Sequence, residues 1–138
     1  MAEIFSIQTN FDILLILEPK ECFSKVRLVG AHNNALNRIY TKEGELLNGM
    51  QHYVDYGRQY AIWFDGIQEW FIGLLSEVEE GKFTRGYLQN DEFVECPTDT
   101  NDWREADSGE WNTNLNAKLT DYSKWPKYSR FKQILIFY

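Results

Sequence analysis

Short runs of apolar residues alternate with turn-forming Gly, Asn and Asp along most of the chain. The runs are rich in β-branched and aromatic residues and too short to show the apolar face of a long helix, a pattern that is typical of strands. They predict strands within residues 25–30, 38–41, 51–56 and 83–88. Residues 112–119 predict a further strand, in which Leu115, Ala117 and Leu119 would share one face.

The strongest local signal is Asp65-Gly66, which stands between the apolar runs of residues 60–73. Asp-Gly between alternating apolar residues favours a two-residue hairpin turn with positive φ at both turn positions. We therefore expect a hairpin here, around which the sheet is organised. Asn48-Gly49 is a second signal of the same kind.

Three segments are less clear. The apolar run of residues 13–17 is consistent with a buried strand, although its periodicity also fits a helical turn. Residues 130–138 form another apolar strand, which either pairs with the same sheet or is covered by a partner, because an open apolar edge would aggregate. Residues 73–81 form either a short helix capped by Gly81 or an irregular loop.

Eight to ten short strands and at most one short helix indicate an all-β protein, a small antiparallel sandwich or barrel. A length of 138 residues favours a single domain over 1–138. Within it we distinguish an N-terminal strand extension (1–24), a β module (25–119) and a basic aromatic tail with the terminal strand (120–138).

The β module carries a spaced pattern of Gly, Asn, aromatic residues and Cys-Pro. Its members are Gly30, Asn37, Tyr40, Gly44, Asn48-Gly49, Tyr53-Val54, residues 60–66, residues 70–73, Gly86-Tyr87, Cys96-Pro97, Trp103 and Trp111. This pattern resembles a small β module that occurs singly or in tandem copies in eukaryotic proteins. The resemblance covers about residues 29–119 and implies a β fold, with no activity attached.

Aromatic residues make up 16% of the chain, and the formal net charge is −7. The charge is uneven, because residues 89–110 hold eight acids against the single base Arg104, whereas residues 118–132 hold five bases against Asp121. An acidic body disfavours binding to nucleic acid. We expect no nucleic-acid partner for the body of the domain.

Cys22 and Cys96 are the only cysteines. They could form a disulfide, but we favour two buried free thiols, because the spacing matches no paired-cysteine motif. The first residues do not resemble a signal peptide, no N-x-[ST] sequon occurs, and no apolar run reaches the length of a membrane span. A cytoplasmic location is therefore favoured.

The acidic segment could hold calcium. It begins like an EF-hand loop at Asp99, but Trp103 occupies the fifth position and no Gly the sixth. A site outside that motif would use Asp99, Asn101, Asp102, Asp107 and Glu110. We favour a solvated loop and expect no cofactor, with calcium as the open alternative.

Trp103 and Trp111 lie eight residues apart in this polar stretch. Sugars stack on aromatic rings while carboxylates and amides bind their hydroxyl groups. Both Trp residues, with the five polar residues above, are therefore candidate glycan-binding residues. The alternative, which we favour, is that both rings fill the core from a long loop.

The tail interleaves bases with aromatic rings, with Trp125, Tyr128, Arg130 and Phe131 as candidate partner-binding residues. Such a segment could bind single-stranded nucleic acid, but packing on the domain or docking onto a protein fits an acidic chain better.

No nucleophile motif occurs, and His32 and His52 stand alone, so we expect no enzyme. The sequence favours a non-enzymatic binding or assembly module that contacts a protein partner, or another copy of itself, through its aromatic surface and terminal extensions. The alternative is a lectin-like carbohydrate-binding domain that uses the loop Trp and acidic residues, with or without the help of calcium.

Overall fold

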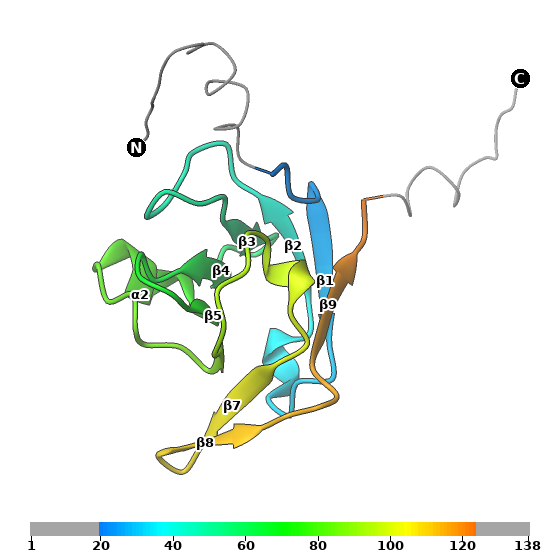
Figure 1. Cartoon of the computed structure of the whole chain (residues 1–138), viewed down its shortest axis with the longest axis vertical. Helices are drawn as coiled ribbons and strands as arrows, with labels where there is room; N and C mark the ends of the chain where they lie inside the picture. The colour runs from blue at the N-terminus through cyan, green and yellow to red at the C-terminus, as the bar shows by residue number, and fades with distance from the viewer. Residues whose placement is uncertain (1–19, 124–138) are drawn as a thin grey trace, which may run out of the picture.

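The computed structural model describes residues 20–123, which form one antiparallel nine-stranded sheet in the order β8-β7-β6-β5-β4-β3-β2-β1-β9 (Figure 1). The strands are β1 (Lys25–Val29), β2 (Ile39–Lys42), β3 (Tyr53–Asp55), β4 (Tyr60–Phe64), β5 (Trp70–Leu74), β6 (Leu88–Asn90), β7 (Trp103–Asp107), β8 (Glu110–Thr113) and β9 (Lys118–Asp121). The helical elements are α2 (Leu75–Glu79) and the 3-10 turns η1 (Asn34–Leu36) and η2 (Pro97–Asp99). The expected all-β class with one short helix is confirmed.

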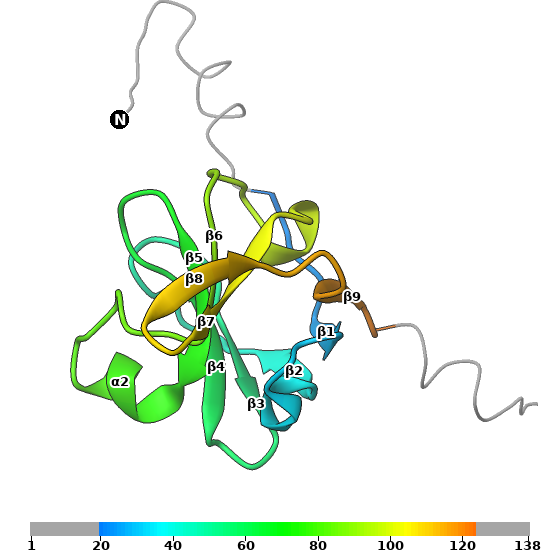
Figure 2. The same ribbon diagram turned by 90° about the horizontal axis from the view of Figure 1, so that it is seen from below.

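The sheet curls into a half-barrel (Figure 2). Its two faces are buried unequally. The main core gathers large side chains such as Trp70, Trp103 and Tyr40, all fully buried. A smaller cluster on the other face contains Trp63, Phe71 and Leu75, the last of these from α2. Strands β4 and β5 are therefore covered on both sides, which is why nearly every residue in them is buried.

The central hairpin exists, but the expected two-residue turn was wrong. Asp65 and Glu69 close a five-residue loop, in which the Asp65 N–H donates to the Glu69 carbonyl at 2.8 Å. The Asp65 carboxylate accepts from the N–H groups of Ile67, Gln68 and Glu69 at 2.8, 2.9 and 3.1 Å. Only Gly66 has positive φ, at 95°. The Asp side chain organises the longer loop by satisfying three donors.

Asn48-Gly49 is a true two-residue turn. Both residues have positive φ, 54° and 84°, and the flanking Leu47 and Met50 exchange both backbone hydrogen bonds, at 2.8 and 3.1 Å. The Asn48 amide donates to the carbonyl of Phe64 at 2.7 Å. This second turn is thereby held against the end of the central hairpin.

The single strand expected over residues 112–119 was wrong. The segment holds the end of β8 and the start of β9, which stand at opposite ends of the strand order. Asn114 makes the break, because its Nδ2 donates to the carbonyl of Gly30 at 3.0 Å and to Glu105 Oε1 at 2.8 Å. Leu115 is consequently 76% exposed, whereas Ala117 and Leu119 are buried.

Residues 75–79 form a helix, so the helical alternative is confirmed for this segment. Gly81, with φ +77°, ends it: the Lys82 N–H donates to the Glu77 carbonyl at 2.8 Å and the Gly81 N–H to the Val78 carbonyl at 3.0 Å. This is the Schellman arrangement.

The strand expected over residues 83–88 begins only at Leu88. The preceding segment instead packs over the sheet, where the Trp63 indole N–H donates to the carbonyl of Phe83 at 2.8 Å. Gly73 and Gly86 make that approach possible, because a Cβ on Gly73 would lie 2.9 Å from the Gly86 Cα.

Cys22 and Cys96 form a disulfide, so the preference for free thiols was wrong. Both residues are buried, and the bridge ties the segment before β1 to the loop before η2. An ion pair between Lys20 and Asp99 at 2.8 Å joins the same two segments. The pairing depends on contacts between residues 74 positions apart, which the local spacing does not reveal.

The apolar runs at residues 13–17 and 130–138 lie outside the described residues, as do the rest of the first extension and most of the tail. Within residues 20–123, no helix is long and apolar enough to cross a membrane.

Candidate functional site

The hairpin of β7 and β8 forms one end of the strand order (Figure 2). Ser108 and Gly109 make its two-residue turn, with φ of 53° and 84°. All four residues of β8 are exposed, whereas β7 alternates and buries Trp103 and Glu105. Most of the acidic segment, expected as a loop, thus leads into or forms this hairpin, and Ser108-Gly109 is the turn signal that would have revealed it.

The two candidate Trp residues have different environments. Trp103 is fully buried in the main core, so its ring cannot serve as a platform for sugar stacking. Trp111 is 37% exposed and stands opposite Ala106 in the hairpin. The expectation that both rings fill the core is therefore right for Trp103 and wrong for Trp111.

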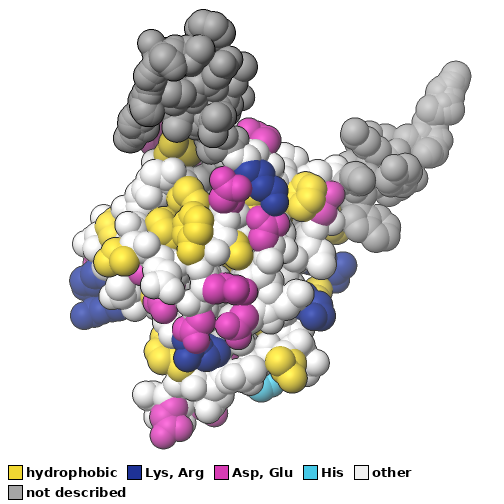
Figure 3. Space-filling model, viewed as in Figure 1, with side chains coloured by type: hydrophobic (Ala, Val, Ile, Leu, Met, Phe, Trp, Pro, Cys, Tyr) yellow, Lys and Arg dark blue, Asp and Glu magenta, His cyan; other side chains and the backbone are white. Residues whose placement is uncertain are grey.

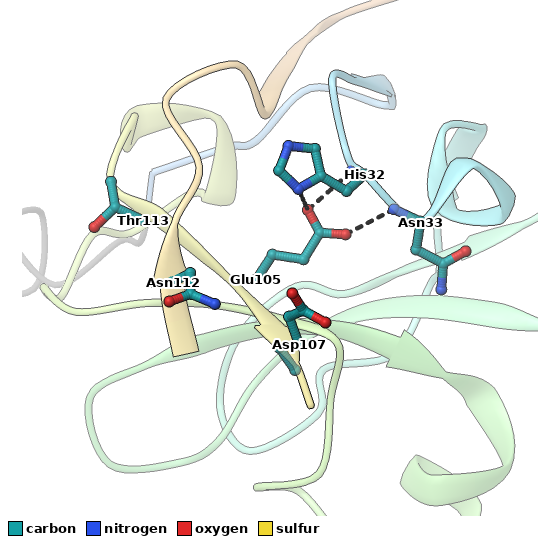
Figure 4. A pocket seen from close by; sticks show the side chains of 7 residues that line it. His32, Asn33, Glu105, Asp107, Asn112 and Thr113 are labelled. Atoms are coloured by element: carbon teal, nitrogen blue, oxygen red, sulfur yellow. Dashed lines mark hydrogen bonds and ion pairs between the residues drawn. The ribbon is translucent and has the colours of Figure 1, made fainter. Parts of the chain in front are cut away.

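Glu105 is a buried carboxylate that the sequence did not single out (Figure 4). Its Oε1 accepts from the His32 N–H at 2.9 Å, and its Oε2 from the Asn33 N–H at 2.8 Å. The Asn114 amide donates to Oε1 as well, at 2.8 Å. Three donors hold this carboxylate in place, and it ties the loop after β1 to the hairpin. Its position two residues after Trp103 would have marked it as inward-facing, had a strand been expected here.

A pocket of about 350 Å³ opens beside Glu105 (Figure 4). The polar residues that line it are His32, Asn33, Glu105, Asp107, Asn112 and Thr113. Among residues 20–123, the Asp107 carboxylate accepts only from the hydroxyl of its neighbour Ser108, at 3.2 Å. The His32 side chain is 78% exposed. Two carboxylates thus face the pocket, and no Lys or Arg of residues 20–123 lines it.

The outer edge of β8 carries backbone groups that no residue of 20–123 pairs with. The N–H of Asn114 donates to the carbonyl of Trp103 at 2.9 Å, and the register pairs Glu105 with Asn112 and Asp107 with Glu110. Hydrogen-bonded and non-bonded pairs alternate in an antiparallel ladder, so the N–H and C=O groups of Trp111 and Thr113 point away from β7. No described residue supplies a hydrogen-bond partner for these groups on that side.

The opposite edge of the sheet is less open. At β9, Leu119 is only 5% exposed, and η2 packs beside the strand. The neighbouring Thr100 is 2% exposed. In the described part of the chain, β8 is therefore the more accessible edge strand.

The polar residues expected to bind calcium are not brought together. Asp99 pairs with Lys20, Asn101 and Asp102 are exposed before β7, and Asp107 and Glu110 stand at its far end. The five residues of β7 separate these groups by about 17 Å. Residues 20–123 contain no group of three or more His, Cys, Asp or Glu that could hold a metal ion.

A second buried carboxylate, Asp55, belongs to the scaffold. It accepts from the N–H groups of Gln59 and Tyr60, both at 2.8 Å, and pairs with the Arg38 guanidinium at 2.9 Å. Burial raises the pKa of the Asp55 carboxyl, but the backbone N–H groups and Arg38 together outweigh it, so the net pKa is lowered. This network closes the β3–β4 turn.

Trp125, Tyr128, Arg130 and Phe131, the candidate partner-binding residues, lie outside the described residues. We found no family model, curated protein or solved structure that matches the chain. The resemblance to a eukaryotic β module therefore stays a prediction.

Proposed function

We propose that this chain is a non-enzymatic binding module that contacts a protein partner. The observation that carries the proposal is the edge strand β8, whose Trp111 and Thr113 direct backbone donors and acceptors outward, where no residue of 20–123 pairs with them. An open sheet edge is a template for a further strand, and adding an extended segment is a recurring mode of peptide recognition.

Trp111 supports the same proposal. Its partly exposed ring stands next to the outward-facing backbone groups, where it can cover one face of an added segment. Trp is enriched among the residues that dominate binding energy at protein interfaces. Strand β8 is only four residues long, which suits a short segment.

The terminal extensions form the second part of the proposal. The basic, aromatic tail with Trp125, Tyr128, Arg130 and Phe131 complements an acidic surface, either that of the partner or that of another copy. Figure 3 shows acidic side chains spread over one face of the molecule, together with groups of hydrophobic side chains and several Lys and Arg side chains.

The pocket beside Glu105 suits binding better than catalysis. Its buried carboxylate already accepts three hydrogen bonds, which leaves it poorly placed to take a proton from a substrate. This supports a non-enzymatic role.

A carbohydrate-binding domain is the second candidate. The pocket's Asp107 and Asn112 offer the polar groups that bind sugar hydroxyls. However, Trp111 stands opposite Ala106 and so faces away from Asn112 and Asp107, because neighbouring strand residues point to opposite faces. A sugar in the pocket would not stack on that ring.

Site-specific photo-crosslinking tests the proposed function. A benzoylphenylalanine replaces Trp111 in the full chain, and a matched control carries it at Ile67, which is 83% exposed on the central hairpin. The proposal predicts discrete protein adducts from position 111 that are absent from position 67. Equal adducts at both positions would contradict it, as would glycan-array binding that Asn112→Ala abolishes without any adduct at position 111.

A further inference from the structure

We propose that the partner segment at β8 is an extended peptide that places a Lys or Arg side chain in the pocket beside Glu105. Its backbone pairs with Trp111 and Thr113 as a tenth strand, and its basic residue lies opposite Asn112. This proposal rests on the proposed function and names the chemistry of the partner.

The backbone of the edge sets the register. The outward groups of Trp111 and Thr113 are two residues apart, a spacing of about 7 Å that matches the repeat of an extended strand. An added strand pairs its own N–H and C=O groups with both. The peptide residue between these pairing positions lies opposite Asn112.

The alternation of side chains then selects the pocket. Cross-strand neighbours share a face, so the peptide residue opposite Asn112 points to the same side as Asn112, Glu105 and Asp107. This is the side on which the pocket opens (Figure 4). The flanking peptide residues point to the other side, along the Trp111 ring.

Charge decides what that residue is. Glu105 and Asp107 line the pocket, Glu110 stands opposite Asp107, and no Lys or Arg of the described residues faces them there. The single Arg of the hairpin, Arg104, stands opposite Thr113 on the other face and pairs with Asp91. An ammonium or guanidinium group supplies the missing positive charge and donates to the Asp107 carboxylate.

The same charges argue against β8 of a second copy as the occupant. Residues 110–113 contain Glu110 and no base, and the whole chain carries a net charge of −7. Two such edges would bring like charges together, which opposes pairing. The occupant is therefore a basic segment rather than another β8.

The probe is an eight-residue peptide of alternating Thr and Lys with blocked ends, and its control replaces every Lys by Glu. Binding to the full chain is followed by NMR titration of the backbone amides. We expect the basic peptide to shift the amides of β8 and the pocket, and the acidic peptide to bind at least about five-fold more weakly, because attraction is replaced by repulsion.

Two variants at one position test the backbone pairing. Thr113→Pro removes an outward N–H and no bond of the β7–β8 ladder, a place where edge strands tolerate Pro. This variant should lower the affinity for the basic peptide about five- to ten-fold, which is the loss expected for one or two main-chain hydrogen bonds. Thr113→Val keeps the N–H and should bind the peptide like the original chain.

A variant in the pocket tests the charge. Asp107→Asn should weaken binding of the basic peptide about three-fold and reduce the salt dependence of that binding.

Several results would overturn this inference. They are no binding of the basic peptide at millimolar concentration, equal binding of the acidic one, or unchanged binding by a folded Thr113→Pro variant. Self-association that Thr113→Pro abolishes would show that a second copy occupies the edge. If crosslinks at position 111 persist while these tests fail, the protein-binding function stands and only the basic-strand inference falls.

Discussion

Two hairpins of this molecule have similar turn signals and very different surroundings. The β4–β5 hairpin is buried on both faces, by the main core and by the cluster under α2. The β7–β8 hairpin buries only alternate residues of β7 and exposes all of β8. The first is continuous with other strands on both sides, whereas the second ends the strand order.

The difference shows that a turn signal locates a hairpin but not its role. Asp65-Gly66 lies between two strands that cannot be changed without disturbing packing, so this hairpin is scaffold. Ser108-Gly109 lies next to an edge strand whose outward backbone groups have no partner among residues 20–123, and we propose that this hairpin serves recognition. The predictions below test that division.

The largest effect is expected for Trp63→Ala in the central hairpin. Trp63 is fully buried and its indole N–H is bonded to the Phe83 carbonyl, so the variant should lose about 3–5 kcal/mol of unfolding free energy. The matched variant Trp111→Ala should lose no more than about 0.5 kcal/mol, because it is partly exposed on an edge. Urea unfolding measures both. Similar losses at the two positions would break the division between scaffold and surface.

The second-largest loss of stability is expected when the disulfide is removed. Removing it by Cys22→Ser with Cys96→Ser should cost about 2–5 kcal/mol, since it closes a long loop. Thermal melting with and without a thiol reductant gives the same comparison on the unaltered chain. An unchanged melting temperature would show that the bridge does not form. Disulfides are rare in reducing compartments, so the thiol state found in cells also tests the expected cytoplasmic location.

Two glycines with nearly equal φ separate packing from backbone strain. Gly30 has φ +83° and a Cβ there would meet the Asn116 carbonyl oxygen at 1.9 Å, so Gly30→Ala should cost about 2–4 kcal/mol. Gly109 has φ +84° and open space, so Gly109→Ala should cost only about 1 kcal/mol. Chemical denaturation ranks the pair. A larger loss for Gly109→Ala than for Gly30→Ala would mean that the loop between β8 and β9 moves easily to make room for the added Cβ.

A smaller, pH-dependent effect is expected at Asp55. Its pKa in the folded chain lies below the ordinary value of about 3.8, so its contribution is present above that value and is lost as pH falls toward the folded pKa. The melting temperature should fall below about pH 4, and Asp55→Asn should flatten that fall while costing about 1–3 kcal/mol near neutral pH. A variant with the same acid slope as the original chain would show that other carboxyls carry the effect.

How much of this could be predicted depends on the range of each interaction. The strands near Val26, Tyr40 and Ile62 follow from local apolar patterns, and the structure confirms them. The five-residue loop at Asp65 depends on one side chain capping three donors, for which Asp-Gly gives no sign. The acids around Trp103 hide the period of two in β7, so the sequence predicts a loop at this candidate residue.

The disulfide and the contacts of Glu105 with His32 and Asn33 join residues more than 70 positions apart. No local pattern encodes such a pairing, since it arises only when the sheet curls and brings the loop after β1 to β7. The site was therefore only partly predictable: Asp107 and Trp111 were named from the sequence, whereas Glu105, His32 and the free edge of β8 depend on the fold.

Amide hydrogen exchange of β8 in the full chain tests the central claim most directly. Without peptide, the amides of Trp111 and Thr113 should exchange quickly, whereas that of Asn112, which pairs with β7, should be protected. Adding the Thr–Lys peptide should slow exchange at Trp111 and Thr113 and leave Asn112 nearly unchanged. Protection of Trp111 and Thr113 in the free chain, or no slowing when the peptide is bound, would contradict a free edge that accepts a strand.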